Sequence, residues 1–362
     1  MNYNIKTVIN KEFGEIKRTL AASKIPESVI WFLTERCNLT CGHCFVSHKG
    51  RVYRNEMNYD QIKSIIDSFQ GSLKKISFTG GEPLIFKDFS KVFLYASSLA
   101  QMNELHVSTN GMLNDKLFST LGECNNDQVQ YSIQSSIDGP EEIHNKIRGN
   151  KRAFKEVIQL LKLFYEFKSK SKLSLNLHLV MTVSRLNQYS VLETMELAQT
   201  YNIPVTLNFV RSSTDSKLDK SEISDFIPQE SDNNELSIEE INSVIATWCR
   251  FAEKYYEFFV YKLNKTRMQN VLYYYKKGIW QFPCSAGINN AVIFSDGSVS
   301  ICETKKPFAK LQDFDLNYRK LWKEHYTGKM HTCFCSYDCA MDYSINKSAK
   351  GHWVAVKELI GI

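Results

Sequence analysis

Residues 28–44 read Ser28-Val-Ile-Trp-Phe-Leu-Thr-Glu-Arg-Cys37-Asn-Leu-Thr-Cys41-Gly-His-Cys44. The first part is a short apolar run, which predicts a buried strand. The second part has a Cys-x3-Cys-x2-Cys spacing. Three thiolates leave one iron of a 4Fe-4S cluster without a protein ligand, so that this iron can bind and reduce a small molecule. A zinc knuckle is the alternative, but it normally needs a fourth Cys or His at matching spacing.

A glycine pair follows the next apolar run, in Thr79-Gly80-Gly81-Glu82-Pro83. Glycine has no Cβ, so its backbone can approach a ligand closely. Alone, this stretch would be a turn. A cysteine loop after one strand and Gly-Gly-Glu-Pro after the next resemble the radical S-adenosylmethionine (radical SAM) superfamily, over roughly residues 28–211. The resemblance implies that the open iron chelates S-adenosylmethionine and that a reducing electron yields a 5'-deoxyadenosyl radical.

Apolar runs alternate with helix-length amphipathic segments along the same region, which is typical of a parallel α/β sheet. We predict six strands, near Val29 to Leu33, Lys75 to Phe78, Glu104 to Ser108, Val129 to Ile133, Leu173 to Val183 and Val205 to Val210. A helix is predicted over Asn58 to Phe69, with Asn58 as its cap. Six units fit the partial (β/α)6 barrel of the resembled superfamily, with chemistry at the C-terminal ends of the strands.

The resemblance also implies which residues contact the cofactor. The stretch from Ser136 to Arg148 resembles the segment that holds the methionyl carboxylate, with Ser136 donating a hydrogen bond and Arg148 a charge-assisted one. The full set of predicted cofactor contacts is His43, Gly80, Gly81, Glu82, Pro83, Ser108, Asn110, Ser136 and Arg148.

A second group of cysteines lies near the C-terminus. Cys284 and Cys302 bracket a predicted β-hairpin with an Asp296-Gly297 turn, which would bring the two thiols together. With three later cysteines they resemble the SPASM and twitch extensions of radical SAM enzymes. The five predicted ligands, fewer than the seven of a full SPASM domain, imply one auxiliary 4Fe-4S cluster, with zinc as the alternative: Cys284, Cys302, Cys333, Cys335 and Cys339.

The predicted organisation has four parts. Residues 1–27 form an N-terminal extension, 28–211 the partial barrel, 212–280 a linker and aromatic-rich helical region, and 281–362 the small hairpin and helix extension for the auxiliary cluster. In the third part a capping box at Ser237 is predicted to open one long helix that runs to Tyr275. Its aromatic residues are better explained as a core-facing stripe than as a platform that stacks on a substrate.

Composition limits the classes of function. The chain has 362 residues, 43% of them hydrophobic, and a formal net charge of +6 without a basic stripe, so nucleic acid is not an expected partner. No apolar run is long enough to span a bilayer, and no signal peptide follows Met1, so a cytoplasmic location is expected. Ten cysteines in such a chain are better explained as metal ligands than as disulfides.

The resemblance implies an enzyme that abstracts hydrogen from a ribosomally made peptide, leading to crosslinking, epimerisation or oxidation. A sugar or aminocyclitol dehydrogenase or epimerase is the first alternative, and a non-catalytic iron-sulfur carrier or scaffold is the second. A flavodoxin or ferredoxin is the expected reductant. Because few residues precede the first strand, leader binding would need a separate protein or another surface of this chain. Cys249 is a candidate hydrogen donor in an epimerisation, although most lone cysteines are buried hydrophobes.

Overall fold

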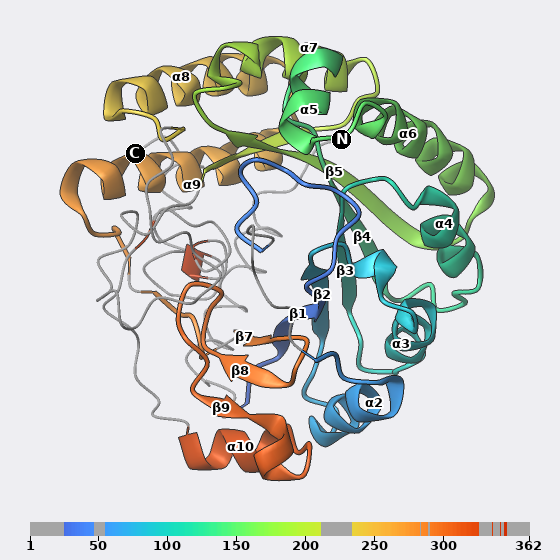
Figure 1. The fold of residues 1–362 in the computed structure, drawn as a ribbon. Helices are drawn as coiled ribbons and strands as arrows, with labels where there is room; N and C mark the ends of the chain where they lie inside the picture. Colours follow the sequence, from blue (N-terminus) through green and yellow to red (C-terminus); the bar gives the residue numbers. More distant parts are fainter. Residues whose placement is uncertain are drawn as a thin grey trace, which may run out of the picture.

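Six parallel strands form the core of the fold. The computed structural model describes residues 25–46, 55–210 and 234–325 except 283 and 289, together with four isolated residues: Cys335, Met341, Ser344 and Ile345. The strands are β1 (Ser28–Thr34), β2 (Lys75–Gly80), β3 (Glu104–Thr109), β4 (Gln130–Ser136), β5 (Ser174–Val183) and β6 (Val205–Phe209). Their order, β6-β5-β4-β3-β2-β1, confirms the predicted partial (β/α)6 architecture (Figure 1).

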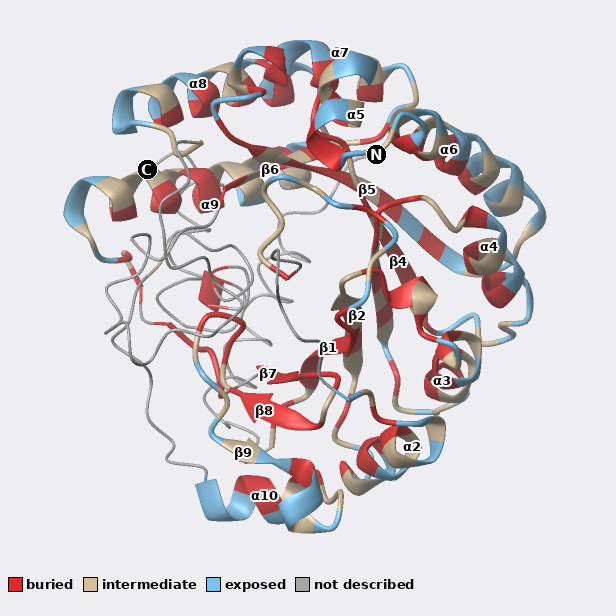
Figure 2. Ribbon diagram, in the orientation of Figure 1, coloured by how far each residue is buried: buried red, intermediate tan, exposed pale blue. Residues whose placement is uncertain are grey.

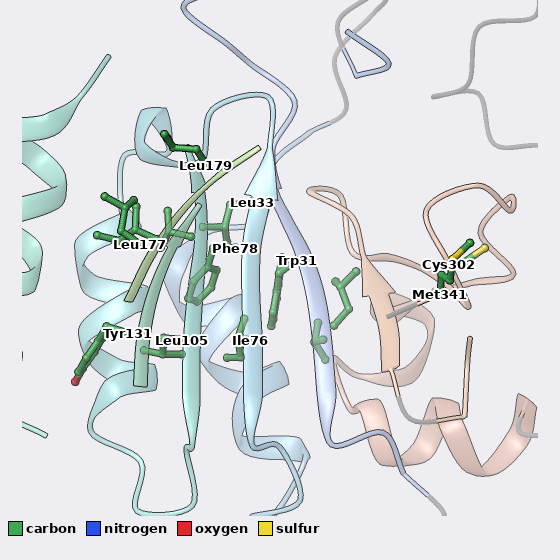
Figure 3. Packing of buried hydrophobic residues seen from close by; sticks show 14 of the residues in the cluster. Trp31, Leu33, Ile76, Phe78, Leu105, Tyr131, Leu177, Leu179, Cys302 and Met341 are labelled. Carbon is green, nitrogen blue, oxygen red and sulfur yellow. The ribbon is translucent and has the colours of Figure 1, made fainter. Parts of the chain in front are cut away.

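Helices cover one face of this curved sheet. They are α2 (Tyr59–Ser68), α3 (Phe89–Ser97), α4 (Asn114–Gly122), α5 (Glu141–Arg148), α6 (Ala153–Lys170) and α7 (Val191–Gln199), with short 3-10 helices η1 (Pro83–Ile85) and η2 (Gln188–Ser190). Alternate strand residues point toward the helices, as the period of two requires. Figure 3 shows Trp31, Phe78, Leu105 and Leu177 among these buried side chains. The outer helix faces are exposed (Figure 2), so the main core lies between sheet and helices.

Local caps begin the helices where the sequence indicates. The Asn58 side chain accepts a hydrogen bond from the Gln61 amide, and Gln61 bonds back to Asn58, which confirms the predicted start of α2. Ser237 and Glu240 form the same reciprocal cap at the start of α8 (Ile238–Tyr255). The predicted single helix to Tyr275 is wrong, however. The chain leaves the helical conformation at Tyr256 and starts again in α9 (Phe258–Lys277), which packs on α8.

These two helices also cover the outer edge of the sheet. The Val205 amide donates a hydrogen bond to the Tyr256 hydroxyl at 2.8 Å, and the Trp248 indole donates to the Val205 carbonyl at 2.9 Å. Arg267 donates to the Leu207 carbonyl at 3.0 Å. An open strand edge would leave such groups unpaired. Side chains of α8, α9 and the junction between them therefore bond the edge of β6 that no described strand pairs.

The predicted C-terminal hairpin is present and extends the same sheet. Strands β7 (Asn290–Ile293) and β8 (Ser298–Ser300) are antiparallel and joined through Asp296 and Gly297. Gly297 has a φ of 81°, which glycine adopts without strain. Strand β7 pairs parallel with β1, and β8 pairs with β9 (Ala309–Lys310). Because β7 pairs with β1, the hairpin is continuous with the barrel sheet. Helices η5 (Leu311–Phe314) and α10 (Tyr318–His325) follow it in the chain.

Candidate active site

The cysteine loop begins where β1 ends, and the glycine pair at the end of β2 holds it there. The Gly81 amide donates to the Thr34 carbonyl at 2.8 Å, and the Glu82 amide donates to the Arg36 carbonyl at 2.9 Å. A Cβ added to Gly80 would lie 2.0 Å from the Thr34 carbonyl oxygen, and one on Gly81 would lie 2.2 Å from that of Arg36. We expected the glycines to admit a ligand. The structure shows them close to the backbone of Thr34, the last residue of β1, and of Arg36, which precedes Cys37.

The opposite side of the loop rests on the end of α5. The Gly42 amide donates to the Ile147 carbonyl at 3.0 Å. Gly149, which ends α5 with a φ of 65°, lies so close to Thr40 that an added Cβ would be 2.5 Å from its hydroxyl oxygen. Residues after β2 and β4 thus fix the loop from two sides.

Glu82 lies buried beneath the loop. Its carboxylate accepts hydrogen bonds from the Asn110 amide at 2.8 Å, the Thr109 hydroxyl at 3.0 Å and the Leu84 amide at 3.2 Å. Burial raises the pKa of Glu82 to about 7, although these hydrogen bonds oppose the change. Its neighbour Pro83 is also buried and begins η1. Glu82 therefore joins the ends of β2 and β3.

Asn110 follows β3 and reaches the first cysteine. Its side-chain amide donates to the side-chain oxygen of Asn38 at 2.8 Å and lies 3.6 Å from the Cys37 sulfur. Its own side-chain oxygen accepts from the Met112 amide, which fixes the orientation of the group. Hydrogen bonds to sulfur tune iron-sulfur clusters, so Asn110 is placed to act on Cys37.

A buried ion pair lies beside the second cysteine. The Arg148 Nε is 2.6 Å from Asp138 Oδ2, and Arg148 Nη1 donates toward the Cys41 sulfur at 3.7 Å. Burial would lower the pKa of Arg148, but Asp138 and Cys41 outweigh it and raise that pKa. Burial would likewise raise the pKa of Asp138, but Arg148 outweighs it and lowers that pKa. Both groups stay charged, so Arg148 reaches Cys41 as a cation.

Two histidines complete this buried group. His43 Nε2 lies 3.9 Å from Asp138 Oδ2, and burial lowers the pKa of His43. His144 Nδ1 accepts a hydrogen bond from the Asp138 amide at 3.0 Å. Burial and the nearby Arg148 charge lower the pKa of His144 to about 4. Both imidazoles are therefore neutral near pH 7.

The three cysteines fit a cluster that binds on one side of a loop. Cys37, Cys41 and Cys44 are all partly exposed, and two of them have N–H groups directed at sulfur. Burial raises the pKa of Cys37 to about 12 and raises that of Cys41, so iron must displace thiol protons when it binds. Within the described ranges no three Cys, His, Asp or Glu side chains could together hold a single metal ion. A four-iron cluster is larger than one ion and can be held by more widely spaced thiolates.

The remaining predicted cofactor contacts lie on the strands themselves. Ser108 precedes the last residue of β3, and Ser136 is the last residue of β4; both are partly exposed. They point away from the helices, because their neighbours Val107 and Ser135 are buried on the helix side. Both serines thus face the interior of the partial barrel, near the end that carries the cysteine loop.

The second cysteine group is described in part. Cys284 and Cys302 are buried at the two ends of the hairpin segment, and Cys302 lies beside Met341 (Figure 3). The Trp280 indole donates to the Cys335 carbonyl at 2.7 Å, which holds Cys335 near the start of the same segment. Cys333 and Cys339 lie outside the described residues. The structure therefore leaves the ligand set of the auxiliary cluster as a prediction.

Cys249 lies between the two C-terminal helices. It is partly buried on α8 and packs against the main core. Burial raises the pKa of Tyr261 on α9, and a Cys249 thiolate would add to that increase, so the two side chains are neighbours. The role of Cys249 as a hydrogen donor stays a prediction.

Sequence analysis missed several residues of the site. Asp138 lies in the stretch that we connected with the methionyl carboxylate, yet its role as the ion-pair partner of Arg148 was not predicted. Arg36 forms two hydrogen bonds with Glu56, at 2.8 and 2.7 Å, and the Thr34 hydroxyl donates to the same carboxylate. An Arg immediately before the first cysteine was the only available signal for this pair.

Comparisons with known proteins agree with this geometry. Residues 31–198 match the family model described as the radical SAM superfamily. Fe-coproporphyrin III synthase of Methanosarcina barkeri is 35% identical over 128 residues, which cover 35% of this chain and 31% of that protein. The sporulation killing factor maturation protein SkfB of Bacillus subtilis is 30% identical over 176 residues, covering 48% and 40%. The chain thus matches less than half of the length of these relatives.

Solved structures share the fold at low sequence identity. SuiB of Streptococcus suis, crystallised with the precursor peptide SuiA, has a TM-score of 0.56 and 14% identity, covering 89% of this chain and 73% of SuiB. The tagged form of anSMEcpe with bound AdoMet has a TM-score of 0.55 and 18% identity, covering 93% and 98%. The match to the radical SAM superfamily model covers just under half of the chain, and the cysteine loop lies within the matched residues 31–198.

Proposed function

We propose that the chain binds a 4Fe-4S cluster through Cys37, Cys41 and Cys44 and cleaves S-adenosylmethionine to abstract hydrogen from a substrate. The observation that carries this proposal is the convergence of three partly exposed thiols with Asn110 and Arg148 at one end of the parallel strands. When bound, the cluster would supply the electron that splits the sulfonium and releases a carbon radical. An electron carrier alone would not need this set of buried polar groups around an incomplete ligand set.

The chain's own residues would orient the cofactor. Glu82 is anchored by three hydrogen bonds beside Cys37, and Ser108 and Ser136 face the barrel interior from β3 and β4. Arg148 carries a fixed positive charge that can attract the methionyl carboxylate while Asp138 keeps it in place. His43, Gly80, Gly81, Pro83 and Asn110 complete the proposed contact set.

For the substrate we propose a ribosomally made peptide. One relative is named as a maturation protein of the sporulation killing factor, and a structure with a similar fold contains a precursor peptide. A small-molecule substrate is the alternative, because other relatives are a GTP 3',8-cyclase of Arabidopsis thaliana, 30% identical over 136 residues, and the coproporphyrin synthase. Crosslinking, epimerisation and oxidation are all compatible products. In an epimerisation Cys249 would be the donor to test.

The C-terminal segment would hold one auxiliary 4Fe-4S cluster in a SPASM- or twitch-like extension over residues 281–362. Buried Cys284 and Cys302 and the anchored Cys335 support this, with Cys333 and Cys339 as further ligands. A flavodoxin or ferredoxin would deliver electrons, and a separate protein would bind a leader peptide. We also propose a cytoplasmic location. In the described parts of the chain, no helix combines the length and hydropathy of a membrane span.

Anaerobic reconstitution tests the proposal directly. We expect about eight irons per chain and formation of 5'-deoxyadenosine when S-adenosylmethionine and dithionite are added. Changing Cys37, Cys41 and Cys44 together to Ala should remove about half of the iron and all 5'-deoxyadenosine. The control is Cys124→Ala, a partly buried cysteine whose thiol contacts the Thr120 carbonyl on α4. Cleavage that persists in the triple variant would overturn the proposal.

Changes in the second cysteine group test the auxiliary cluster. Cys284→Ala with Cys302→Ala should lower the iron content by about half and leave 5'-deoxyadenosine formation in place. Unchanged iron in that variant, with zinc detected by elemental analysis in the parent chain, would assign the C-terminal site to zinc instead.

A further inference from the structure

Two histidines face each other inside the partial barrel. His106 on β3 lies between buried Leu105 and Val107, and His178 on β5 lies between buried Leu177 and Leu179. Since side chains alternate along a strand, both imidazoles point to the face opposite the helices. The two rings are 5.8 Å apart between centroids, with an interplanar angle of 30°.

A glutamine on the intervening strand links the rings. Gln134 of β4 is in register with His178, and the His178 Nε2–H donates to its side-chain oxygen at 3.2 Å. Gln134 also acts on the pKa of His106, so its side chain lies near that ring as well. His106 Nδ1 is buried and has no hydrogen-bond partner among the described residues. A buried polar atom without a partner is costly, which points to a group that binds there.

The position suits the inner end of a substrate. His106 is four residues before Asn110, so it lies about 13 Å along the strand from the residue that contacts Cys37. Ser108 lies between them on the same face, in register with Gln134. These polar side chains form a continuous line from the cysteine loop into the barrel. A substrate whose reacting carbon lies near the loop would extend along it.

The charges around the two rings favour an uncharged ligand. Burial, the neighbouring His178 and Lys75 all lower the pKa of His106, so its ring is neutral near pH 7. Lys75 is already paired with Glu104 at 2.9 Å. A buried carboxylate would therefore lack a free positive partner. Neutral imidazoles and a carboxamide offer both donors and acceptors, which an amide or hydroxyl group can satisfy together.

We propose that His106, Gln134 and His178 form a binding site for an uncharged amide or hydroxyl group of the substrate. This identification of the ligand as substrate rests on the proposed function, and it favours a peptide bond or an amide side chain over an acidic group. The three side chains lie on strands of the sheet, so their arrangement does not depend on the reaction. Binding of a ligand to them can therefore be measured without turnover.

The test is a titration of the reconstituted full chain, labelled with ¹⁵N in its histidine rings, with N-acetylglycine N-methylamide. We expect saturable shifts of the His106 and His178 ring signals and none for His325 on α10. N-acetylglycine, which carries a carboxylate, should bind roughly tenfold more weakly or worse near neutral pH. Absence of a saturable shift, or a preference for the carboxylate, would overturn the proposal.

Variants separate recognition from packing. His106→Phe keeps a ring but removes both nitrogens, and it should weaken binding of the neutral probe roughly tenfold or more. His106→Asn places a polar atom near the former Nδ1 and should bind more tightly than the Phe variant. Gln134→Leu is a second, nearly isosteric removal of polarity, and His325→Phe is the matched control. If all four variants bind the neutral probe with equal affinity, the proposed binding site is refuted.

The two proposals fail separately. If wild-type chain forms no 5'-deoxyadenosine but the two ring signals shift, the proposed function is wrong and the site remains. If 5'-deoxyadenosine forms while the probe leaves both rings unchanged, only the binding site is refuted.

Discussion

Changing Asp138 to Asn should lower the free energy of unfolding by about 3–5 kcal/mol, because Arg148 would keep a buried charge without its partner. Asn has nearly the same shape, and its side-chain oxygen can still accept from the Thr182 amide, as Asp138 Oδ1 does at 3.1 Å. The substitution therefore removes mainly the ion pair between the Asp138 carboxylate and the Arg148 guanidinium, whose atoms are 2.6 Å apart. In the same variant Arg148 is less firmly held beside Cys41, so iron content should fall as well.

The assay is urea unfolding under anaerobic conditions, followed by circular dichroism. A matched control is Glu166→Gln, which breaks an exposed i,i+4 pair with Lys170 of nearly the same length, 2.7 Å, and should change the free energy of unfolding far less because water already screens this pair. The double variant Asp138→Asn with Arg148→Met should be more stable than Asp138→Asn alone, since it removes the unpaired charge. If Asp138→Asn costs no more than Glu166→Gln, the assignment of a buried, fully charged pair is refuted.

Two further changes address the cysteine loop and the neighbouring histidine. Gly81→Ala would place a Cβ 2.2 Å from the Arg36 carbonyl oxygen and should reduce bound iron severalfold, whereas Gly42→Ala, with open space around its Cβ, should not; equal iron contents would contradict this. The pKa of His144 is about 4 in the folded chain and about 6.5 in the unfolded chain. As the pH falls, His144 is therefore protonated in the unfolded chain before it is protonated in the folded one. Stability should therefore drop by about 2 kcal/mol from this group between about pH 7.5 and pH 5, and His144→Asn, which keeps an acceptor for the Asp138 amide, should lose less over that range.

The sheet was predictable because its signals are local. Six apolar runs of strand length, the cap at Asn58, the capping box at Ser237 and one Asp-Gly turn each depend on neighbouring residues, and all are confirmed. The break at Tyr256 was missed because neither proline nor glycine marks it. The Tyr256 hydroxyl instead bonds the Val205 amide, a contact between residues far apart in the sequence.

The candidate site shows the same difference between local signals, which could be predicted, and contacts between distant residues, which could not. Spacing and the resemblance together indicated Cys37, Cys41, Cys44 and the Gly-Gly-Glu-Pro segment as parts of one site. They could not show that Asp138 pairs with Arg148, because ten residues and a helix separate them and no periodicity connects a loop to a helix end. Nor could they show that Gly80 and Gly81 approach the cysteine loop, since that contact depends on β1 and β2 lying side by side.

The pairing of β7 with β1 affects how the chain is made. Strand β1 is the first described strand to leave the ribosome, but its neighbour on one side arrives roughly 260 residues later. At about 5–20 residues per second, that interval is roughly 10–50 s. Throughout it, the strand that carries the cysteine loop has an unpaired edge, which other chains can extend. Strand β7 can therefore protect that edge only after this interval, whose length is set by the rate of translation.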